Sequence, residues 1–132
     1  MKSTQAPRPA VPPPCPFCQP HEALARNALS YMIYDRHPAS PGHILVVTKR
    51  HCETLFDCSD EERVAMLQLV GEAKALLDET HSPDGYNIGI NVGEAAGQTV
   101  MHCHIHVIPR YAGDVPNPRG GVRAVIPGNQ SY

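Results

Sequence analysis

The sequence predicts an α+β domain in which an antiparallel sheet packs against one main amphipathic helix. Three observations indicate this class. Short apolar segments typical of strands lie on both sides of a single long helical pattern, turn residues separate them closely, and three histidines alternate with apolar residues in the last strand. Short connections favour antiparallel pairing, because parallel neighbours need a long crossover.

The chain length fits one domain. A chain of 132 residues can bury roughly two-thirds of the surface that it exposes when unfolded. Residues 1–14, MKSTQAPRPAVPPP, are rich in proline and poor in apolar anchors, so we expect a flexible lead in polyproline or disordered form. Residues 15–132 are expected to form the single domain.

The N-terminal half of this domain predicts two strands. A short helical turn is expected over residues 22–27, followed by a strand over residues 29–34. Residues 35–42 contain two prolines and predict a loop. Residues 44–47, Ile-Leu-Val-Val, predict a buried strand because they are apolar and mostly β-branched.

Ser59 predicts the start of the main helix. Its hydroxyl can cap the first turn while Glu62, three residues on, completes a capping box. Apolar residues then recur with a period near 3.6, so we expect an amphipathic helix that ends by about Glu79. The positions expected to face the sheet are Val64, Leu67, Val70 or Gly71, and Ala73 to Leu77.

Two further strands follow the helix. Residues 83–85 predict a turn, residues 86–91 a strand, residues 93–97 a loop of small residues, and residues 99–108 the strand that carries the histidines. Successive side chains of a strand point to opposite faces, so the three histidines share one face at intervals of roughly 7 Å. These histidines are His102, His104 and His106. Such a row can supply a nucleophile, a proton carrier or a metal ligand. The alternatives are a surface strand without a role and an expression tag, but tags run consecutively at chain ends.

The composition excludes several classes of protein. The net charge is −2 and the basic residues are scattered, which argues against a nucleic-acid partner. No apolar run approaches the ~18 residues that cross a bilayer, and the N-terminus lacks the apolar region of a secretory signal. We therefore expect a cytoplasmic protein without a membrane partner. Five cysteines, an odd count, suit a reducing compartment and metal ligation better than a disulfide framework.

The segment Cys15-Pro16-Phe17-Cys18 has the spacing at which two thiolates bind one metal ion such as zinc. A closed tetrahedral site needs two more ligands, which His51 and one histidine of the alternating strand can supply. Two alternatives stay open. A thioredoxin-type redox pair needs a preceding strand where this chain has proline-rich coil, and the pair can also be ordinary reduced cysteines.

Four separate blocks of the sequence resemble the histidine triad (HIT) superfamily of nucleotide hydrolases and nucleotidyl transferases. The signature of that superfamily is His-x-His-x-His followed by two apolar residues, as in residues 102–108 here. The order and spacing of the blocks agree with it over nearly the whole chain after the Pro-rich lead. The other blocks are the Cys-Pro-Phe-Cys start, Asp35 and Pro38 before residues 41–47, and Asn91 with Gly97-Gln98-Thr99. The resemblance implies a HIT-like fold with a five-stranded antiparallel sheet, one main helix and a short N-terminal helix.

The resemblance implies three catalytic histidines. His104 corresponds to the middle histidine, which attacks the α-phosphate of a nucleotide, and a neutral imidazole can do this without a separate base. His106 corresponds to the third histidine, which contacts the phosphate and assists departure of the leaving group. His43 corresponds to a histidine that orients the triad through hydrogen bonds, although a purely structural role is the alternative.

The resemblance also implies the substrate contacts. Gly97, Gln98 and Thr99 correspond to the phosphate-contacting loop, in which backbone, amide and hydroxyl donors meet negative charge. Asn91 corresponds to an asparagine of the phosphate region, and Asp35 to a carboxylate that binds the ribose hydroxyls. A turn asparagine and a loop aspartate are the alternatives for these two residues.

Zinc-containing branches of the superfamily use two N-terminal cysteines, a histidine after the second strand and the first histidine of the triad. By that pattern a structural zinc is implied, since protein fills all four positions. Its ligands are Cys15, Cys18, His51 and His102.

The function implied is hydrolysis at the α-phosphate through a nucleotidyl-histidine intermediate. The galactose-1-phosphate uridylyltransferase branch has glutamine where this chain has His106, and the chain lacks the tryptophan-bearing tail of the phosphoramidase branch. The substrate would be a purine nucleotide or dinucleotide, of the diadenosine polyphosphate or adenosine phosphoramidate type, and the enzyme a homodimer paired through a sheet edge and the main helix. Arg119 and Arg123 can contact distal phosphates or serve as surface or dimer-contact residues. The alternatives are a noncatalytic nucleotide-binding or zinc-stabilised interaction module and a zinc-finger nucleic-acid binder.

Overall fold

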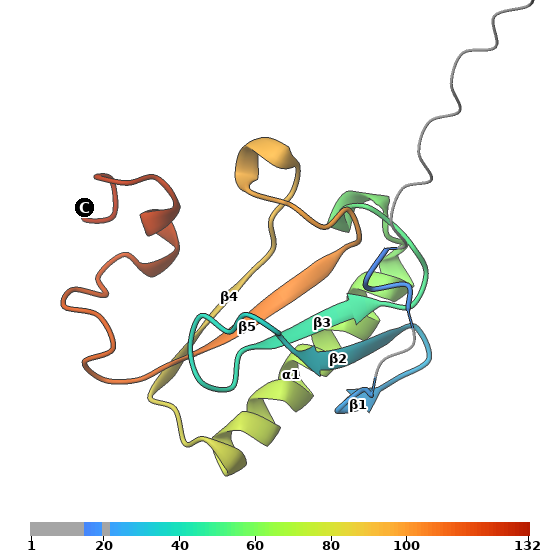
Figure 1. Ribbon diagram of the computed structural model, residues 1–132, viewed down its shortest axis with the longest axis horizontal. Helices are drawn as coiled ribbons and strands as arrows, with labels where there is room; N and C mark the ends of the chain where they lie inside the picture. The colour runs from blue at the N-terminus through green and yellow to red at the C-terminus, as the bar shows by residue number, and fades with distance from the viewer. Residues whose placement is uncertain (1–14, 20–21) are drawn as a thin grey trace, which may run out of the picture.

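A five-stranded antiparallel sheet with one long helix across it forms the core of the computed structural model, which describes residues 15–19 and 22–132 (Figure 1). The strands lie in the order β1-β2-β3-β5-β4. The elements are β1 (Ala25–Arg26), β2 (Ser30–Tyr34), β3 (Ile44–Thr48), α1 (Asp60–Thr80), β4 (Gly85–Gly89) and β5 (His104–Arg110), with 3-10 turns η1 (Leu55–Asp57), η2 (Glu94–Ala96) and η3 (Gly121–Val125). The predicted α+β class is confirmed. The predicted Pro-rich lead, residues 1–14, lies outside the described residues.

The two faces of the sheet differ in what covers them. Ile105 and Val107 of β5 pack with Met66 and Leu69 of α1 in the main core. Burial alternates along β5, so its histidines lie on the face opposite the helix. The short N-terminal segment covers part of that second face through Phe17 and other apolar residues. A half-covered face next to a rigid central strand is a suitable place for a functional site.

The main helix begins and ends close to where the sequence predicts. The Ser59 hydroxyl accepts the Glu62 backbone N–H, and the Glu62 carboxylate accepts the Ser59 N–H, so both halves of the capping box are present. The predicted buried face is wrong in its first turns, since Val64 is 55% exposed and Leu67 64% exposed, whereas Ala73 and Leu77 are buried as predicted. The buried positions are Glu62, Ala65, Met66, Leu69, Ala73 and Leu77. Apolar residues with a helical period occur on two faces of α1, and packing against β2, β3 and β5 selects one of them.

The helical turn that the sequence predicts over residues 22–27 is wrong. Residues 25 and 26 instead form β1, which pairs antiparallel with β2 through Ala25 opposite Met32. Asn27 explains the difference, because its side-chain oxygen accepts the backbone N–H groups of Leu29 and Ser30 and closes a hairpin. A polar side chain that satisfies the backbone locally favours the turn over the helix.

Both of the later strands are displaced from their predicted bounds. The strand predicted over residues 86–91 spans Gly85–Gly89, and the histidine strand predicted from residue 99 begins at His104. The Cys103 N–H donates to the Cys52 carbonyl at 2.7 Å, so the chain just before β5 bonds to the loop that follows β3. His102 therefore precedes the strand, although burial still alternates through residues 103–110.

The C-terminal segment, residues 111–132, lies beyond the end of β5 and is drawn in red in Figure 1. Its only regular element among the described residues is η3. In the part of the chain that the structure describes, no helix is both long and apolar enough to cross a bilayer.

Candidate functional site

A cavity of about 910 Å³ lies on the face of the sheet opposite α1. It extends from the Cys15–Cys18 loop, past the end of β2, to the loop that precedes β5. Six predicted site residues meet on its wall: Asp35, Asn91, Gly97, Thr99, His104 and His106. Apolar side chains such as Phe17, Ile33 and Leu45 line another part of it. A cavity of this size with a few convergent polar groups can hold a nucleotide-sized ligand.

His104 is held in one tautomer by the backbone. Its Nδ1 lies 2.7 Å from the carbonyl oxygen of His102. A carbonyl only accepts hydrogen bonds, so Nδ1 carries the proton and Nε2 keeps its lone pair. The ring therefore offers an unprotonated nitrogen on the wall of the cavity, which is what a nitrogen nucleophile needs.

His106 presents the opposite chemical character. The Ala39 backbone N–H donates to Nδ1 of His43 at 2.9 Å, so the proton of the His43 ring is on Nε2. That proton is donated to Nδ1 of His106, 2.9 Å away, and the remaining proton of His106 is on Nε2. His106 therefore offers an N–H donor beside His104, and the two rings are 5.1 Å apart.

Burial keeps the His106 and His43 rings neutral. Desolvation lowers the pKa of His106 to about 4, and neighbouring His104 and His43 act in the same direction. Desolvation also lowers the pKa of His43, against the opposing effect of the Asp35 carboxylate. His43 is buried and does not line the cavity, so its position fits the predicted orienting role.

Asp35, His43 and His106 converge closely enough to suggest a second metal site, since their potential ligand atoms all lie within 4.8 Å. The hydrogen bonds argue against it. Nε2 of His43 carries the proton that His106 accepts, so it has no free lone pair, and His43 Nδ1 is used by Ala39. Asp35 Oδ2 lies 3.6 Å from His43 Nε2 and Oδ1 accepts the His37 N–H, which leaves Oδ2 available to a ligand in the cavity.

Gln98 is the one predicted substrate contact that does not line the cavity. It is buried, and its Nε2 donates to the carbonyl oxygens of Glu53 at 2.6 Å and Val100 at 3.1 Å. Its Oε1 accepts the Gly93 N–H. The predicted side-chain donor to phosphate is therefore already occupied, and Gln98 instead braces the loop. Gly97, with φ +92, makes the turn beside it that a side chain would strain.

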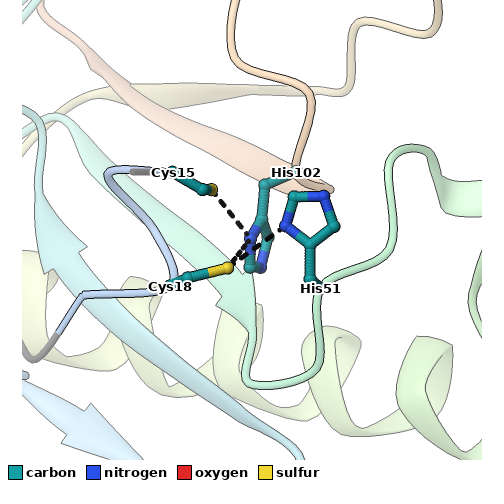
Figure 2. Close-up of side chains that lie close together, drawn as sticks. All are labelled: Cys15, Cys18, His51 and His102. Carbon is teal, nitrogen blue, oxygen red and sulfur yellow. Dashed lines mark hydrogen bonds between the residues drawn. The ribbon is translucent and has the colours of Figure 1, made fainter. Parts of the chain in front are cut away.

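Figure 2 shows the second predicted constellation, in which three separate segments bring two thiols and two imidazoles together. His102 Nδ1 lies 3.3 Å from Cys15 Sγ and 3.4 Å from Cys18 Sγ. His51 Nδ1 lies 3.1 Å from Cys18 Sγ. Ligands at ~2.0 and ~2.3 Å from one tetrahedral ion lie roughly 3.5 Å apart, so these separations fit a metal centre.

The orientation of His102 strengthens this interpretation. Its Nε2 lies 2.7 Å from the Thr48 carbonyl oxygen, so Nε2 carries the proton and the lone pair of Nδ1 points at the thiols. Protein supplies four ligand atoms, which leaves no open position for catalysis. The described residues therefore form a closed site that could hold a metal ion and that joins the N-terminal segment to β3 and β5.

Two features of the site were not predicted from the sequence. The Phe17 ring lies between the two constellations, 5.9 Å from the His102 ring and 4.9 Å from the His104 ring. The position of Phe17 between the two cysteines of the sequence is the signal that could have indicated this contact.

The second feature is an ion pair next to the metal-site residue His51. The Arg50 guanidinium binds the buried Glu62 carboxylate and holds the pKa of that group down to about 2, which anchors this segment to the start of α1.

Arg119 and Arg123 do not line the cavity. Both guanidinium groups lie over the Tyr132 ring, and they bond to the carbonyl oxygens of Tyr132 and Asn129. In the described chain they stabilise the C-terminal segment, which favours the surface interpretation over contact with distal phosphates.

Residues 18–113 match the family model described as HIT domain. A protein of Mycobacterium tuberculosis named AP-4-A phosphorylase is 35% identical over 92 residues, covering 69% of this chain and 47% of that protein. A protein of Schizosaccharomyces pombe named adenosine 5'-monophosphoramidase is 36% identical over 102 residues, covering 73% of this chain and 74% of that protein. The chain thus spans about half the length of the first of these relatives.

Solved structures of histidine triad proteins are also similar to this chain. A zinc-bound histidine triad family protein from Mycobacterium smegmatis superposes with a TM-score of 0.71 at 34% identity, covering 79% of this chain and 80% of that one. A HIT family protein from Bacillus anthracis superposes with a TM-score of 0.70 at 30% identity, covering 74% of each chain.

Proposed function

This chain belongs to the HIT domain family, and from that premise we propose that it is an enzyme, a nucleotide hydrolase that cleaves at the α-phosphate through a nucleotidyl-histidine intermediate. The observation that carries the proposal is the pair of fixed tautomers on one cavity wall. His104 offers a lone pair, and His106, two residues further along the same face of β5, offers a proton donor.

In the first step, Nε2 of His104 attacks the α-phosphorus and the bond from phosphorus to the leaving group breaks. The ring becomes a cation, and the His102 carbonyl that holds Nδ1–H stabilises that charge. The Nε2–H of His106 donates to the departing group. A phosphate leaving group departs as an anion, so this hydrogen bond suffices and no net proton transfer is needed.

In the second step, water attacks the same phosphorus and the electron pair of the phosphorus–nitrogen bond returns to His104. The proton of the water passes to solvent, and a nucleoside monophosphate is released. The free Oδ2 of Asp35 would bind the ribose hydroxyls, while Asn91, Gly97 and Thr99 would contact the phosphate. The apolar wall near Phe17 and Ile33 would hold a purine base.

The relatives support two types of substrate. One is a dinucleotide, since relatives are named AP-4-A phosphorylase and bis(5'-nucleosyl)-tetraphosphatase, and the other is an adenosine phosphoramidate, since another relative is named a monophosphoramidase. We expect diadenosine polyphosphates to be the better substrates, because their phosphate leaving groups need no protonation.

A panel of both substrate types, with the products separated by chromatography, tests the function. The expected result is release of AMP from each substrate that turns over, with the highest kcat/KM for a diadenosine polyphosphate. Tight nucleotide binding without turnover of any member would instead support the noncatalytic binding module.

We further propose that the Cys15, Cys18, His51 and His102 site holds a structural zinc ion. Zinc suits two thiolates and two imidazoles in a closed tetrahedral set, and the matched M. smegmatis structure is described as zinc-bound. The cytoplasmic location stays a prediction from the sequence, and it agrees with a site that needs reduced thiols.

A homodimer is the remaining part of the proposal. In the described sheet β4 is an edge strand, and Val64 and Leu67 of α1 expose apolar surface that the sheet does not cover. Leu67→Glu should place a charge in such an interface and lower the molar mass measured by light scattering from that of a dimer to that of one chain. Val122→Glu, an equally exposed position on the C-terminal segment, is the matched control and should stay dimeric. A wild-type protein that elutes as a single chain would contradict the dimer.

A further inference from the structure

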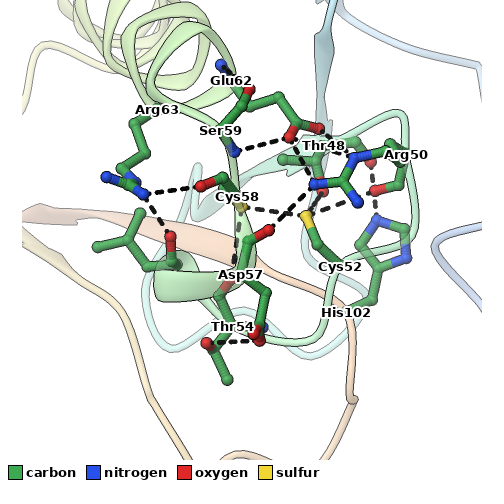
Figure 3. A network of polar contacts seen from close by, with 11 residues as sticks. Thr48, Arg50, Cys52, Thr54, Asp57, Cys58, Ser59, Glu62, Arg63 and His102 are labelled. Atoms are coloured by element: carbon green, nitrogen blue, oxygen red, sulfur yellow. Dashed lines mark hydrogen bonds and ion pairs between the residues drawn. The ribbon is translucent and has the colours of Figure 1, made fainter.

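A second pair of thiols lies outside both constellations, in the loop between β3 and α1. Cys52 Sγ and Cys58 Sγ are 3.0 Å apart, and each residue is 4% exposed (Figure 3). Neither sulfur is a ligand of the predicted metal site, and neither residue lines the cavity. The pair has no role in the proposed hydrolysis.

We propose that Cys52 and Cys58 are an oxidation site that forms an intrachain disulfide with hydrogen peroxide as the oxidant. One thiolate attacks the peroxide, the O–O bond breaks, and a sulfenic acid and water form. The second thiol then attacks the sulfenic sulfur, the S–S bond forms, and a second water leaves. The sum is two thiols and one peroxide to one disulfide and two waters.

The geometry requires only a small movement. The two sulfurs must approach from 3.0 Å to about 2.0 Å. The segment between them is the short 3-10 turn η1 with its Thr54 cap, and Phe56 within it is 75% exposed. A one-turn element with so little burial can adjust or open locally without unfolding α1 or the sheet.

The same geometry makes the thiols slow to react while the loop is closed. Burial raises the pKa of the Cys58 thiol well above its ordinary value, so little thiolate is present while the loop is closed. Oxidation therefore follows local opening of η1. The Cys103 thiol also faces Cys58, but Cys103 is fixed just before β5 by its backbone bond to Cys52.

The position of the pair links it to both constellations. Thr48 contacts Cys52 Sγ through its hydroxyl at 3.4 Å and orients the predicted ligand His102 through its carbonyl. The next residue after Cys52, Glu53, accepts the bond from Gln98 that braces the cavity loop. A disulfide would fix this connection covalently, so we expect it to stabilise the fold.

Tryptic digestion separates the possible disulfides cleanly. Cleavage after Arg50 and Arg63 yields the peptide 51–63, which contains Cys52 and Cys58 and no other cysteine. Cys15 and Cys18 fall in a second peptide and Cys103 in a third. The experiment treats the folded, metal-loaded protein with hydrogen peroxide, blocks the remaining thiols, digests it and measures peptide masses.

The expected result is a 51–63 peptide lighter by two hydrogen atoms, which dithiothreitol restores. The urea midpoint of the oxidised protein should rise by roughly 1 M relative to the reduced protein. Cys58→Ala should lose both effects, whereas Cys103→Ala, the matched buried-thiol control, should keep the light peptide.

Three results would overturn the proposal. One is a 51–63 peptide that stays reduced while other residues of the folded protein oxidise. Another is a cross-link from peptide 51–63 to the peptide of Cys103. The third is conversion of Cys58 to sulfinic acid without an S–S bond. None of these bears on the hydrolase assignment, which the substrate panel tests separately.

Discussion

His104→Ala is expected to lower kcat for dinucleotide hydrolysis on the order of a thousandfold or more, because no other group lies where it can form the bond to phosphorus. His106 cannot replace it, since its Nδ1 accepts the His43 proton and its Nε2 carries a proton. The binding of AMP should change little, because the other cavity residues remain. Steady-state hydrolysis and calorimetric AMP binding measure the two effects.

The matched control is His81→Ala, which removes an imidazole that lies outside the cavity. It should keep wild-type kcat and KM. Brief reaction with a radiolabelled nucleotide followed by acid-free denaturation should leave label on wild-type protein and none on His104→Ala. Equal kcat in His104→Ala and the wild type would exclude the covalent mechanism.

Cys18→Ser is expected to remove the metal and lower the melting temperature by on the order of 10 °C, since metal binding contributes directly to folding stability. Cys18 contacts both imidazoles of the site, and its loss leaves three ligands on three separate segments. Elemental analysis should give one zinc per chain in the wild type and none in the variant. Calorimetry then measures the stability change.

Cys103→Ala is the control for this experiment as well. It removes a buried thiol one residue from His102, so it should lower stability through lost packing while retaining one zinc per chain. Two results would count against the four ligands. One is a Cys18→Ser protein that melts at the wild-type temperature, and the other is a wild-type protein that folds with no metal. A chelator added to the wild type should reproduce the Cys18→Ser melting temperature.

Local patterns predicted much of the fold. The capping box of Ser59 and Glu62 placed the start of α1 correctly, because its two hydrogen bonds depend only on residues three positions apart. The β-branched run at Ile44 to Val47 gave β3 to within one residue. The turn at Asn27 was missed, because its side chain competes with the helix through a hydrogen bond that no periodicity reveals.

Some features of the candidate site were predicted from the sequence and others were not. The alternation around His104 placed the proposed nucleophile and His106 on one face, since a period of two is a property of any strand. Gln98 was expected to point at phosphate, yet Glu53, far away in sequence, accepts its amide hydrogen. The face of α1 that packs on the sheet was likewise chosen by distant contacts, which left Leu67 exposed.

The sequence by itself determined the family, which histidines and cysteines form the candidate sites, and the order along the chain of four of the five strands. These follow from residue spacing and local hydrogen bonding. Only the tertiary structure decided which nitrogen of each imidazole carries a proton. Those protons are fixed by the carbonyls of His102 and Thr48 and by the N–H of Ala39. Such partners come from turns and neighbouring strands, so the chemical role of each ring depends on the folded backbone around it.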